Sequence, residues 1–181
     1  MIERVTDLVK EILIRDKDID LAVDMTAGNG NDSAFILDVL GAKELVAFDI
    51  QKAARENTLK LLGPRDNFTF ILDSHANIDK YIKEKIDLAV YNLGYLPNFD
   101  KTITTRADST IDSLDKVLSL LRKRGRVILT IYPGHAQGKI EADRLDHFLE
   151  ELDPKDFAIL KLSYPNKKDI SPYVVTIEKK F

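Results

Sequence analysis

The sequence contains no cysteine among its 181 residues. This absence excludes disulfide bonds, zinc sites built on thiolates and covalent catalysis by a thiol nucleophile. It fits the reducing environment of the cytosol, so a cytoplasmic location is expected.

Long hydrophobic runs are absent as well. No apolar stretch approaches the roughly 20 residues needed to span a bilayer, and no association with membranes is expected. The first residues, MIERVTDLVKEIL, mix acidic with apolar side chains, so we expect neither a signal peptide nor a transit peptide. With 44% hydrophobic and 31% charged residues, the chain is predicted to form a single domain over residues 1–181.

Excess positive charge is also lacking. The formal net charge of -3 argues against broad electrostatic binding to nucleic acid. The one dense basic cluster, at residues 122–126 (RKRGR), is interpreted as a solvated helix end, because lysine and arginine favour the C-terminus of a helix.

What the sequence does contain is a regular alternation of short apolar runs with helical patterns. Strands are predicted at residues 21–23, 44–49, 68–72, 86–91 and 126–132. Helices are predicted at about residues 5–13, 32–40, 52–62, 78–83, 106–124 and 138–152. Such alternation implies a mainly parallel sheet with helices on both faces.

The last part of the chain has a different pattern. Residues 157–164 and 173–180 both alternate like strands, and the eight residues between them are too few for a helical crossover. These two strands are therefore predicted to form an antiparallel hairpin. The fold expected is α/β and Rossmann-like, with a seven-stranded, mostly parallel sheet of the class I methyltransferase type.

The loop after the first strand, AVDMTAGNGND at residues 22–32, has features of a ligand site. Gly28 and Gly30 allow a sharp turn and close approach of a ligand, and the N–H groups of the following helix favour anions. Asp49, at the end of the second strand, is placed to accept both hydroxyls of a ribose. Both a nicotinamide dinucleotide and S-adenosylmethionine fit these features, although Ser33 stands where the dinucleotide fingerprint has a third glycine. The alternative is a plain connecting turn with Asp49 as a helix cap.

Polar groups also follow the third and fourth strands. Asp73, Ser74 and His75 end the third strand, where they could contact an adenine ring or cap a helix. The segment Asn92-Leu93-Gly94-Tyr95 ends the fourth strand and resembles the Asn-Pro-Pro-Tyr type motif of methyltransferases that modify amino nitrogens. In those enzymes, hydrogen-bond acceptors of the motif orient the N–H bonds of the substrate amine, so that the nitrogen lone pair points at the methyl group to be transferred.

The full set of motifs resembles a family of small bacterial class I methyltransferases once labelled "putative rRNA methylases". The resemblance rests on MTAGNGND (25–32), AFDIQ (47–51), DSHANI (73–78), NLGYLPNFDK (92–101) and YPGHAQGKIEADRL (132–145). Characterised members methylate the amine of 5-aminomethyl-2-thiouridine at the tRNA wobble position. This chain departs from the family pattern at Asn98-Phe99, where glycines are usual, and at Asn31, where histidine is common.

The resemblance implies S-adenosylmethionine as cofactor and the tRNA anticodon stem-loop as partner. It assigns catalytic roles to Asn92, Tyr95 and His135, with His135 as a candidate proton acceptor or phosphate contact. The residues expected around the cofactor are Thr26, Gly28, Asn29, Gly30, Asn31, Asp32, Asp49, Gln51, Ser74, His75 and Asn92.

The expected function is thus conversion of a wobble 5-aminomethyl group to 5-methylaminomethyl. Two alternatives stay open: methylation of another amino nitrogen, in rRNA, a protein or a small molecule, and a non-catalytic subunit that binds S-adenosylmethionine. The absence of cysteine argues against methylation of a uracil ring carbon through a thiol adduct. A homodimer would enlarge the surface that this small chain offers to tRNA.

Overall fold

A computed structural model describes residues 4–16, 18–93, 107–167 and 170–181 of the chain. The strands are β1 (Leu21–Asp24), β2 (Glu44–Phe48), β3 (Phe68–Ile71), β4 (Ile86–Asn92), β5 (Leu121–Ile131), β6 (Phe157–Leu162) and β7 (Tyr173–Lys179). The helices are α1 (Val5–Leu13), α2 (Asn31–Asp38), α3 (Lys52–Leu62), the short 3₁₀ helix η1 (His75–Asn77), α4 (Ile78–Tyr81), α5 (Ala107–Leu120) and α6 (Ala136–Glu150). Within these described ranges, no helix combines the length and apolar character required to cross a membrane.

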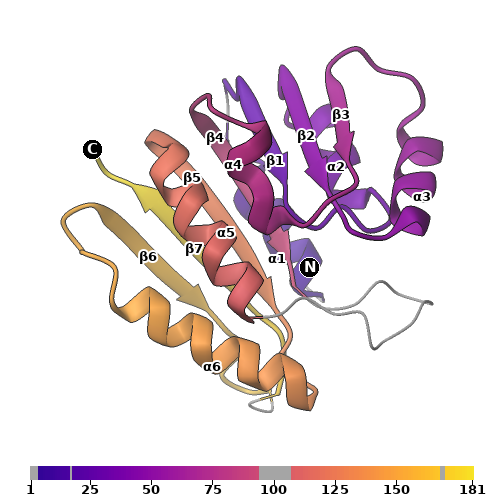
Figure 1. The fold of residues 1–181 in the computed structure, drawn as a ribbon. Helices are drawn as coiled ribbons and strands as arrows, with labels where there is room; N and C mark the ends of the chain where they lie inside the picture. Colours follow the sequence, from indigo (N-terminus) through magenta and orange to yellow (C-terminus); the bar gives the residue numbers. More distant parts are fainter. Residues whose placement is uncertain (1–3, 17, 94–106, 168–169) are drawn as a thin grey trace.

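All seven strands form one sheet in the order β3-β2-β1-β4-β5-β7-β6 (Figure 1). Strands β1 to β5 are parallel to one another, whereas β7 runs antiparallel to both β5 and β6. The hairpin β6–β7 therefore inserts its second strand beside β5. The mostly parallel sheet and the antiparallel hairpin predicted from the sequence are confirmed.

The apolar residues of the strands divide between two cores, one on each face of the sheet. In β1, Leu21 and Val23 belong to one cluster, and Ala22 between them belongs to the other. This division follows from the two-residue period of a strand, which turns successive side chains to opposite faces. Helices α4, α5 and α6 contribute to the first cluster, and α1, α2 and α3 contribute to the second (Figure 1). Helices on both faces are thus confirmed.

The order of the strands places a crevice at the edge of the sheet where β1 and β4 end. From β1 the chain proceeds outward to β2 and β3, and it then returns to β4 on the other side of β1. The connections on the two sides of β1 therefore diverge, which leaves an opening outside the carboxyl ends of the central strands. Figure 1 shows the arrowheads of β1 to β5 pointing toward this edge.

The predicted end of the helix at residues 106–124 is wrong, because α5 stops at Leu120 and β5 begins at Leu121. Residues 122–125 form a bulge, since Leu121 pairs with Ile86 whereas Arg126 already pairs with Leu88. Arg124 adopts a left-handed backbone with φ of 62°. A Cβ on Gly125 would lie 2.9 Å from the carbonyl oxygens of Arg122 and Ile86. The tight backbone turn at residues 122–125 therefore ends the helix before residue 124, although the sequence pattern is helical up to that point.

Two of the four basic side chains at residues 122–126 are paired with acidic side chains. Arg122 forms an ion pair with Asp87 and lies 3.5 Å from a carboxylate oxygen of Asp20. Arg126 forms an ion pair with Asp16 on the chain that follows α1. The cluster therefore ties α1, β1, β4 and β5 together, and these two arginines do not offer free charge to a polyanion.

Asp87 organises the bulge, and we predict that Asp87→Ala destabilises the protein. Its carboxylate accepts hydrogen bonds from the backbone N–H groups of Asp20 and Leu21, both at 2.9 Å, besides pairing with Arg122. A hydrogen bond to a charged group contributes about 1.5–3 kcal/mol, so we expect the free energy of unfolding in urea to fall by about 2 kcal/mol. Asp115→Ala, on the exposed side of α5, serves as the control. Equal stability of the two variants would contradict the role of Asp87.

Candidate functional site

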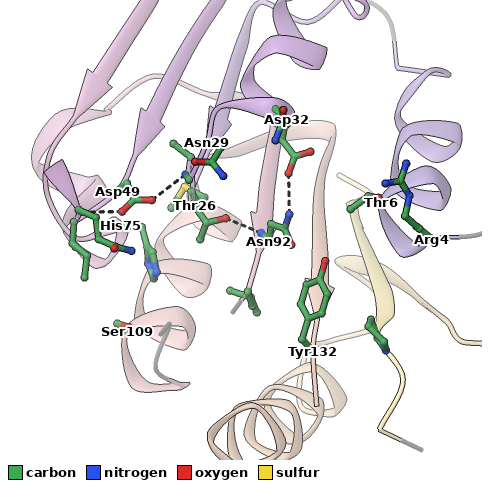
Figure 2. A pocket seen from close by; sticks show the side chains of 18 of the residues that line it. Arg4, Thr6, Thr26, Asn29, Asp32, Asp49, His75, Asn92, Ser109 and Tyr132 are labelled. Carbon is green, nitrogen blue, oxygen red and sulfur yellow. Dashed lines mark hydrogen bonds between the residues drawn. The ribbon is translucent and has the colours of Figure 1, made fainter. Parts of the chain in front are cut away.

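A cleft of about 1140 Å³ lies at the carboxyl ends of the parallel strands. Its walls come from the loops after β1 to β5, from α1 and from the segment before β7 (Figure 2). The cleft brings together most residues predicted from the sequence: Thr26, Gly28, Asn29, Asn31, Asp32, Asp49, Gln51, Ser74, His75, Asn92 and His135. Within the described ranges, no cluster of three or more histidine, aspartate or glutamate side chains could hold a metal ion.

The loop after β1 owes its shape to two glycines in the left-handed region. Gly28 has φ of 53° and Gly30 has φ of 80°. A Cβ on Gly30 would lie 3.0 Å from Thr58 of α3, so the loop and α3 pack more closely than a larger residue allows. Gly30 is buried and precedes α2, and it is not among the residues that line the cleft. Its observed contribution is the turn, whereas Gly28 and Asn29 face the cavity.

Asp49 connects the first two loops. Its carboxylate accepts hydrogen bonds from the N–H groups of Gly28 at 3.0 Å and Gln51 at 2.9 Å. Burial raises the pKa of Asp49, and these backbone N–H groups oppose that rise. Each oxygen has a second lone pair, and Asp49 lines the cleft (Figure 2). The site thus presents two hydrogen-bond acceptors side by side, which is the arrangement that a vicinal diol requires.

The polar residues after β3 divide between structural and cavity roles. Asp73 accepts hydrogen bonds from the Ser74 N–H, the Asn77 amide and the Tyr81 hydroxyl, which lower its pKa. The Ser74 hydroxyl accepts the N–H of Ala76 at 3.3 Å and so caps η1, while Ser74 also lines the cleft.

His75 is a neutral polar group in the wall of the cleft. Burial lowers the pKa of His75 to about 4, so the ring is uncharged at neutral pH. Its edge packs against Tyr91 with ring centroids 5.9 Å apart. Its buried Nδ1 atom has no hydrogen-bond partner among the described residues. A buried polar atom without a partner favours a ligand that completes the hydrogen bond.

Asn92 is held in one orientation at the end of β4. Its backbone N–H donates to the Thr26 hydroxyl at 2.7 Å, and its side-chain amide donates to the Asp32 carboxylate at 3.3 Å (Figure 2). Because a carboxylate only accepts hydrogen bonds, the NH₂ end of the amide must face Asp32. The carbonyl oxygen of the Asn92 side chain is then turned away from Asp32 and remains available as an acceptor.

Two carboxyl groups lie close to Asn92. Asp24 is 1% exposed and accepts hydrogen bonds from the Ser33 hydroxyl at 2.6 Å and the Thr26 N–H at 3.2 Å. Burial, together with the negative charge of Asp32, raises the pKa of Asp24 to about 7. Burial also raises the pKa of Asp32, and the hydrogen bond from Asn92 opposes that rise. Asp32, which lines the cleft, therefore places negative charge in this region and favours a cation.

His135 caps helix α6, with its Nδ1 atom accepting the N–H of Gly138 at 3.0 Å. A Cβ on Gly138 would collide with the carbonyl oxygen of Tyr132 and lie 3.0 Å from the His135 ring, so this contact requires glycine. While Nδ1 accepts a hydrogen bond, the hydrogen of a neutral ring resides on Nε2. In that state His135 can donate a hydrogen bond from Nε2.

Tyr132 stands in the middle of the cleft, with its hydroxyl directed to the region of Asn92 and Asp32 (Figure 2). Burial and the negative charge of Asp32 raise the pKa of Tyr132 to about 12. The hydroxyl is consequently a neutral donor at physiological pH. The sequence places Tyr132 only at the end of the fifth strand, and its central position in the cleft comes from the structure.

Several residues of the cleft carry no signal in the sequence. Arg4, Thr6, Asp7 and Lys10 reach it from the start of α1, and Ser109 reaches it from α5 (Figure 2). Polar residues on one side of an amphipathic helix normally face solvent, so nothing in the pattern of α1 distinguishes these side chains. Tyr95, predicted to face the substrate amine, lies outside the described residues, as do Gly94 and Pro97.

The comparisons with known proteins agree with this geometry. Residues 45–178 match the model of the family described as "Putative rRNA methylase". The chain is similar to the chloroplastic tRNA (mnm(5)s(2)U34)-methyltransferase of Arabidopsis thaliana, with 31% identity over 89% of this chain. This chain spans 64% of the length of that relative.

Solved structures of similar chains extend the comparison. A protein of Clostridium thermocellum described as a "putative rRNA-methylase" is 35% identical, with a TM-score of 0.93 over 99% of both chains. A protein of Streptococcus mutans described as a "putative methyltransferase", in complex with SAH, is also 35% identical, with a TM-score of 0.87 over 99% of both chains. The class I methyltransferase fold expected from the sequence is thereby confirmed.

The raised pKa of Asp24 predicts a specific dependence of stability on pH. The folded protein holds a proton on Asp24 up to a pKa of about 7, whereas an unfolded aspartate releases it near pH 4. Because the folded state binds more protons between these values, this group makes the free energy of unfolding fall as pH rises from about 4 to 7, by at most about 1.4 kcal/mol per pH unit. Above the folded pKa the contribution is constant.

We expect Asp24→Asn to remove this dependence, because asparagine does not ionise, while its oxygen can accept the Thr26 N–H and its NH₂ group can donate to the Ser33 hydroxyl oxygen. Urea unfolding of both proteins at pH 5, 6, 7 and 8 measures the effect. The variant should gain stability relative to the wild type as pH rises toward 7. Parallel curves for the two proteins would show that Asp24 ionises normally in the folded state.

Proposed function

Because the chain belongs to the family described as "Putative rRNA methylase", we propose that it is an S-adenosylmethionine-dependent N-methyltransferase. Its proposed substrate is the 5-aminomethyl group of a uridine or 2-thiouridine at the wobble position of tRNA, which it converts to 5-methylaminomethyl. The observation that carries the proposal is the fixed amide of Asn92 beside an acidic cleft.

The residues near β2 and β3 fit the adenosine part of the cofactor. Asp49 offers adjacent acceptors for the two hydroxyls of a ribose, and the left-handed Gly28 lets the backbone come close to it. The unpartnered Nδ1 atom of His75 lies in the same wall of the cleft and can bond to an adenine ring. Relatives support this assignment, since the similar protein of Streptococcus mutans was solved in complex with SAH.

Asn92 is the proposed orienting group for the substrate amine. The Asp32 carboxylate and the Thr26 hydroxyl hold its side chain and backbone, so its free carbonyl oxygen is positioned before any substrate arrives. An N–H bond of the amine donates to this oxygen, and the nitrogen lone pair is then directed along a fixed line. Fixed orientation of this kind can lower a barrier by several kcal/mol, and about 7–11 kcal/mol is the upper range.

S-adenosylmethionine supplies the reaction with a methyl group on a positively charged sulfur. The neutral amine nitrogen forms a bond to this methyl carbon as the carbon–sulfur bond breaks, and the bonding electron pair stays on sulfur. The nitrogen then carries one extra proton, which it releases to solvent. The negative charge of Asp32 lies beside the position where the nitrogen becomes cationic, and it stabilises that charge.

Two further residues have proposed roles at the substrate end of the cleft. The neutral hydroxyl of Tyr132 can donate to a uracil carbonyl or thiocarbonyl group. His135, held by Gly138, can donate from Nε2 to a phosphate or carbonyl oxygen of the substrate. The role of His135 as a proton acceptor or phosphate contact and the catalytic role of Tyr95 stay predictions.

The single-domain organisation over residues 1–181, the homodimer and the cytoplasmic location also stay predictions. The tRNA substrate is proposed by analogy with the Arabidopsis relative, which is described as a tRNA (mnm(5)s(2)U34)-methyltransferase. Light scattering of the purified protein distinguishes a dimer from a monomer.

The function is tested with S-adenosylmethionine and tRNA from cells that lack the modification, followed by mass spectrometry of the nucleosides. The wild-type protein should add one methyl group to 5-aminomethyl uridine. Asn92→Ala should lower turnover by about 100-fold or more, because the amine loses its orienting acceptor, while cofactor affinity stays near that of the wild type. Asn67→Ala, an exposed residue before β3, is the matched control. Equal turnover in Asn92→Ala would rule out the orienting role.

The assignment of the cofactor end is tested by calorimetry. Asp49→Ala should weaken the binding of S-adenosylmethionine by about tenfold or more, because two acceptors for ribose hydroxyls are removed and the Gly28 and Gln51 N–H groups lose their partner. Asp66→Ala, an exposed aspartate between α3 and β3, should bind like the wild type. An unchanged dissociation constant in Asp49→Ala would remove Asp49 from the binding site.

A further inference from the structure

A second, smaller pocket of about 390 Å³ adjoins the cleft. Arg4, Thr6, Tyr132 and Pro172 line both cavities, so the two share a wall. The smaller one, here called the side pocket, is completed chiefly by Tyr164 and Lys167 from the segment that connects β6 to β7. Of the residues that line the side pocket, only Tyr132 has a role proposed above.

The side pocket lies at the substrate end of the cleft. Asp49 and His75 follow β2 and β3, on one side of β1 in the sheet. Tyr132 follows β5, and Lys167 and Pro172 precede β7, on the other side of β4. Asn92, at the end of β4, is therefore between the proposed adenosine site and the side pocket. A substrate whose amine reaches Asn92 can extend into the side pocket without displacing the cofactor.

A tight turn places a cation at the side pocket. The N–H of Lys167 donates to the carbonyl oxygen of Tyr164 at 3.1 Å, and Pro165 and Asn166 between them suit such a turn. The Lys167 ammonium lies 4.0 Å from the centre of the Tyr164 ring. No acidic side chain among the described residues forms an ion pair with Lys167. Its positive charge therefore packs against an aromatic ring, and no acidic side chain of the described ranges neutralises it.

Tyr164 contributes a second feature that points to a ligand. Its hydroxyl oxygen is buried and has no hydrogen-bond partner among the described residues. Leaving a buried hydroxyl unpaired is unfavourable, and a ligand with an acceptor atom would satisfy it. A phosphate oxygen is such an acceptor, and the nearby ammonium of Lys167 attracts the negative charge that a phosphate carries.

The distribution of charge separates the two ends of the site. Asp32, Asp49 and Asp73 line the part of the cleft near β1 to β3, where a phosphodiester would be repelled, and Asp7 lines the cleft beside Arg4. Arg4 and Lys167 line the side pocket, which has no acidic residue in its described wall. Arg4 has only a loose ion pair with Asp7, at 3.6 Å, and its side chain is 80% exposed. The chain has a net charge of -3, so the positive charges of Arg4 and Lys167 direct a polyanion to the side pocket.

We propose that the side pocket binds the phosphate and sugar of the nucleotide next to the target nucleotide in an RNA substrate. Lys167 and Arg4 pair with the phosphate, the Tyr164 hydroxyl donates to one of its oxygens, and the ring of Tyr132 separates the flanking nucleotide from the target base. The inference rests on the proposed function, because it requires a polynucleotide substrate. It adds a contact that explains how a chain of negative net charge selects RNA over a free amine.

The test measures binding of a fluorescent anticodon stem-loop RNA by anisotropy at several salt concentrations, together with calorimetry for S-adenosylmethionine. Lys167→Ala should weaken RNA binding by about fivefold or more and reduce the slope of log affinity against log salt by about 1. Tyr164→Phe should weaken binding by about threefold without changing that slope, because only a neutral donor is lost. Both variants should bind S-adenosylmethionine like the wild type.

Lys155→Ala is the control and should leave the slope unchanged. Lys155 is an exposed lysine just before β6, at the end of the sheet opposite to the cleft.

The outcomes separate this inference from the proposed function. Unchanged RNA affinity and salt dependence in Lys167→Ala, with normal methylation of tRNA, would overturn the role of the side pocket and leave the function standing. Loss of RNA binding to the same extent in Lys155→Ala would also overturn it, because the effect would then be one of general charge. A wild-type protein that binds S-adenosylmethionine but no RNA would overturn both proposals.

Discussion

Parallel pairing of β1 with both β2 and β4 is the constraint on which the rest of the structure depends. It aligns Val23 with Val46 on one side and with Ala89 on the other. The three strands consequently end at the same level, and the loops that follow them meet. The N–H of Ala27 then donates to the carbonyl oxygen of Phe48, and the N–H of Met25 donates to that of Val90, both at 2.9 Å. These bonds extend the pairing into the loop and give the cleft a rigid floor.

The acidic character of the cleft follows from this convergence. Asp24 ends β1, Asp32 lies in the first turn of α2 and Asp49 follows β2, so the three meet at one edge of the sheet. Asp32 and Asp49 line the cleft. Burial of several carboxyl groups is unfavourable unless hydrogen bonds or protons compensate them. Backbone N–H groups compensate Asp49, the Asn92 amide compensates Asp32, and Asp24 holds a proton to about pH 7. The same unfavourable arrangement becomes favourable when a positively charged cofactor and a cationic product occupy the cleft.

The positions of the elements could be predicted from the sequence because local patterns determine them. The limits of α3 and the pairing of the last two strands follow from helical period, strand alternation and the spacing of turns. The end of α5 could not be predicted in this way, because the bulge at residues 122–125 depends on contacts with β4 and on the carboxylate of Asp87. Gly30 was predicted at the site, but only the packing of Thr58 against it shows that it serves the turn. The sequence likewise did not reveal that the His135 ring accepts a hydrogen bond from the Gly138 N–H of the next helix.

The sequence by itself determined the fold class, the edge of the sheet that carries the site and most of the residues there. It could do so because strand ends and glycine turns are local features, and parallel strands bring their carboxyl ends to one edge. Only the tertiary structure decided which atoms of these residues are free. The orientation of the Asn92 amide, the proton on Asp24 and the charge of Lys167 beside Tyr164 all depend on neighbours that are distant in the chain or fixed by a turn. Hydrogen bonding and burial are properties of three-dimensional surroundings, and no spacing of residues along a sequence specifies them.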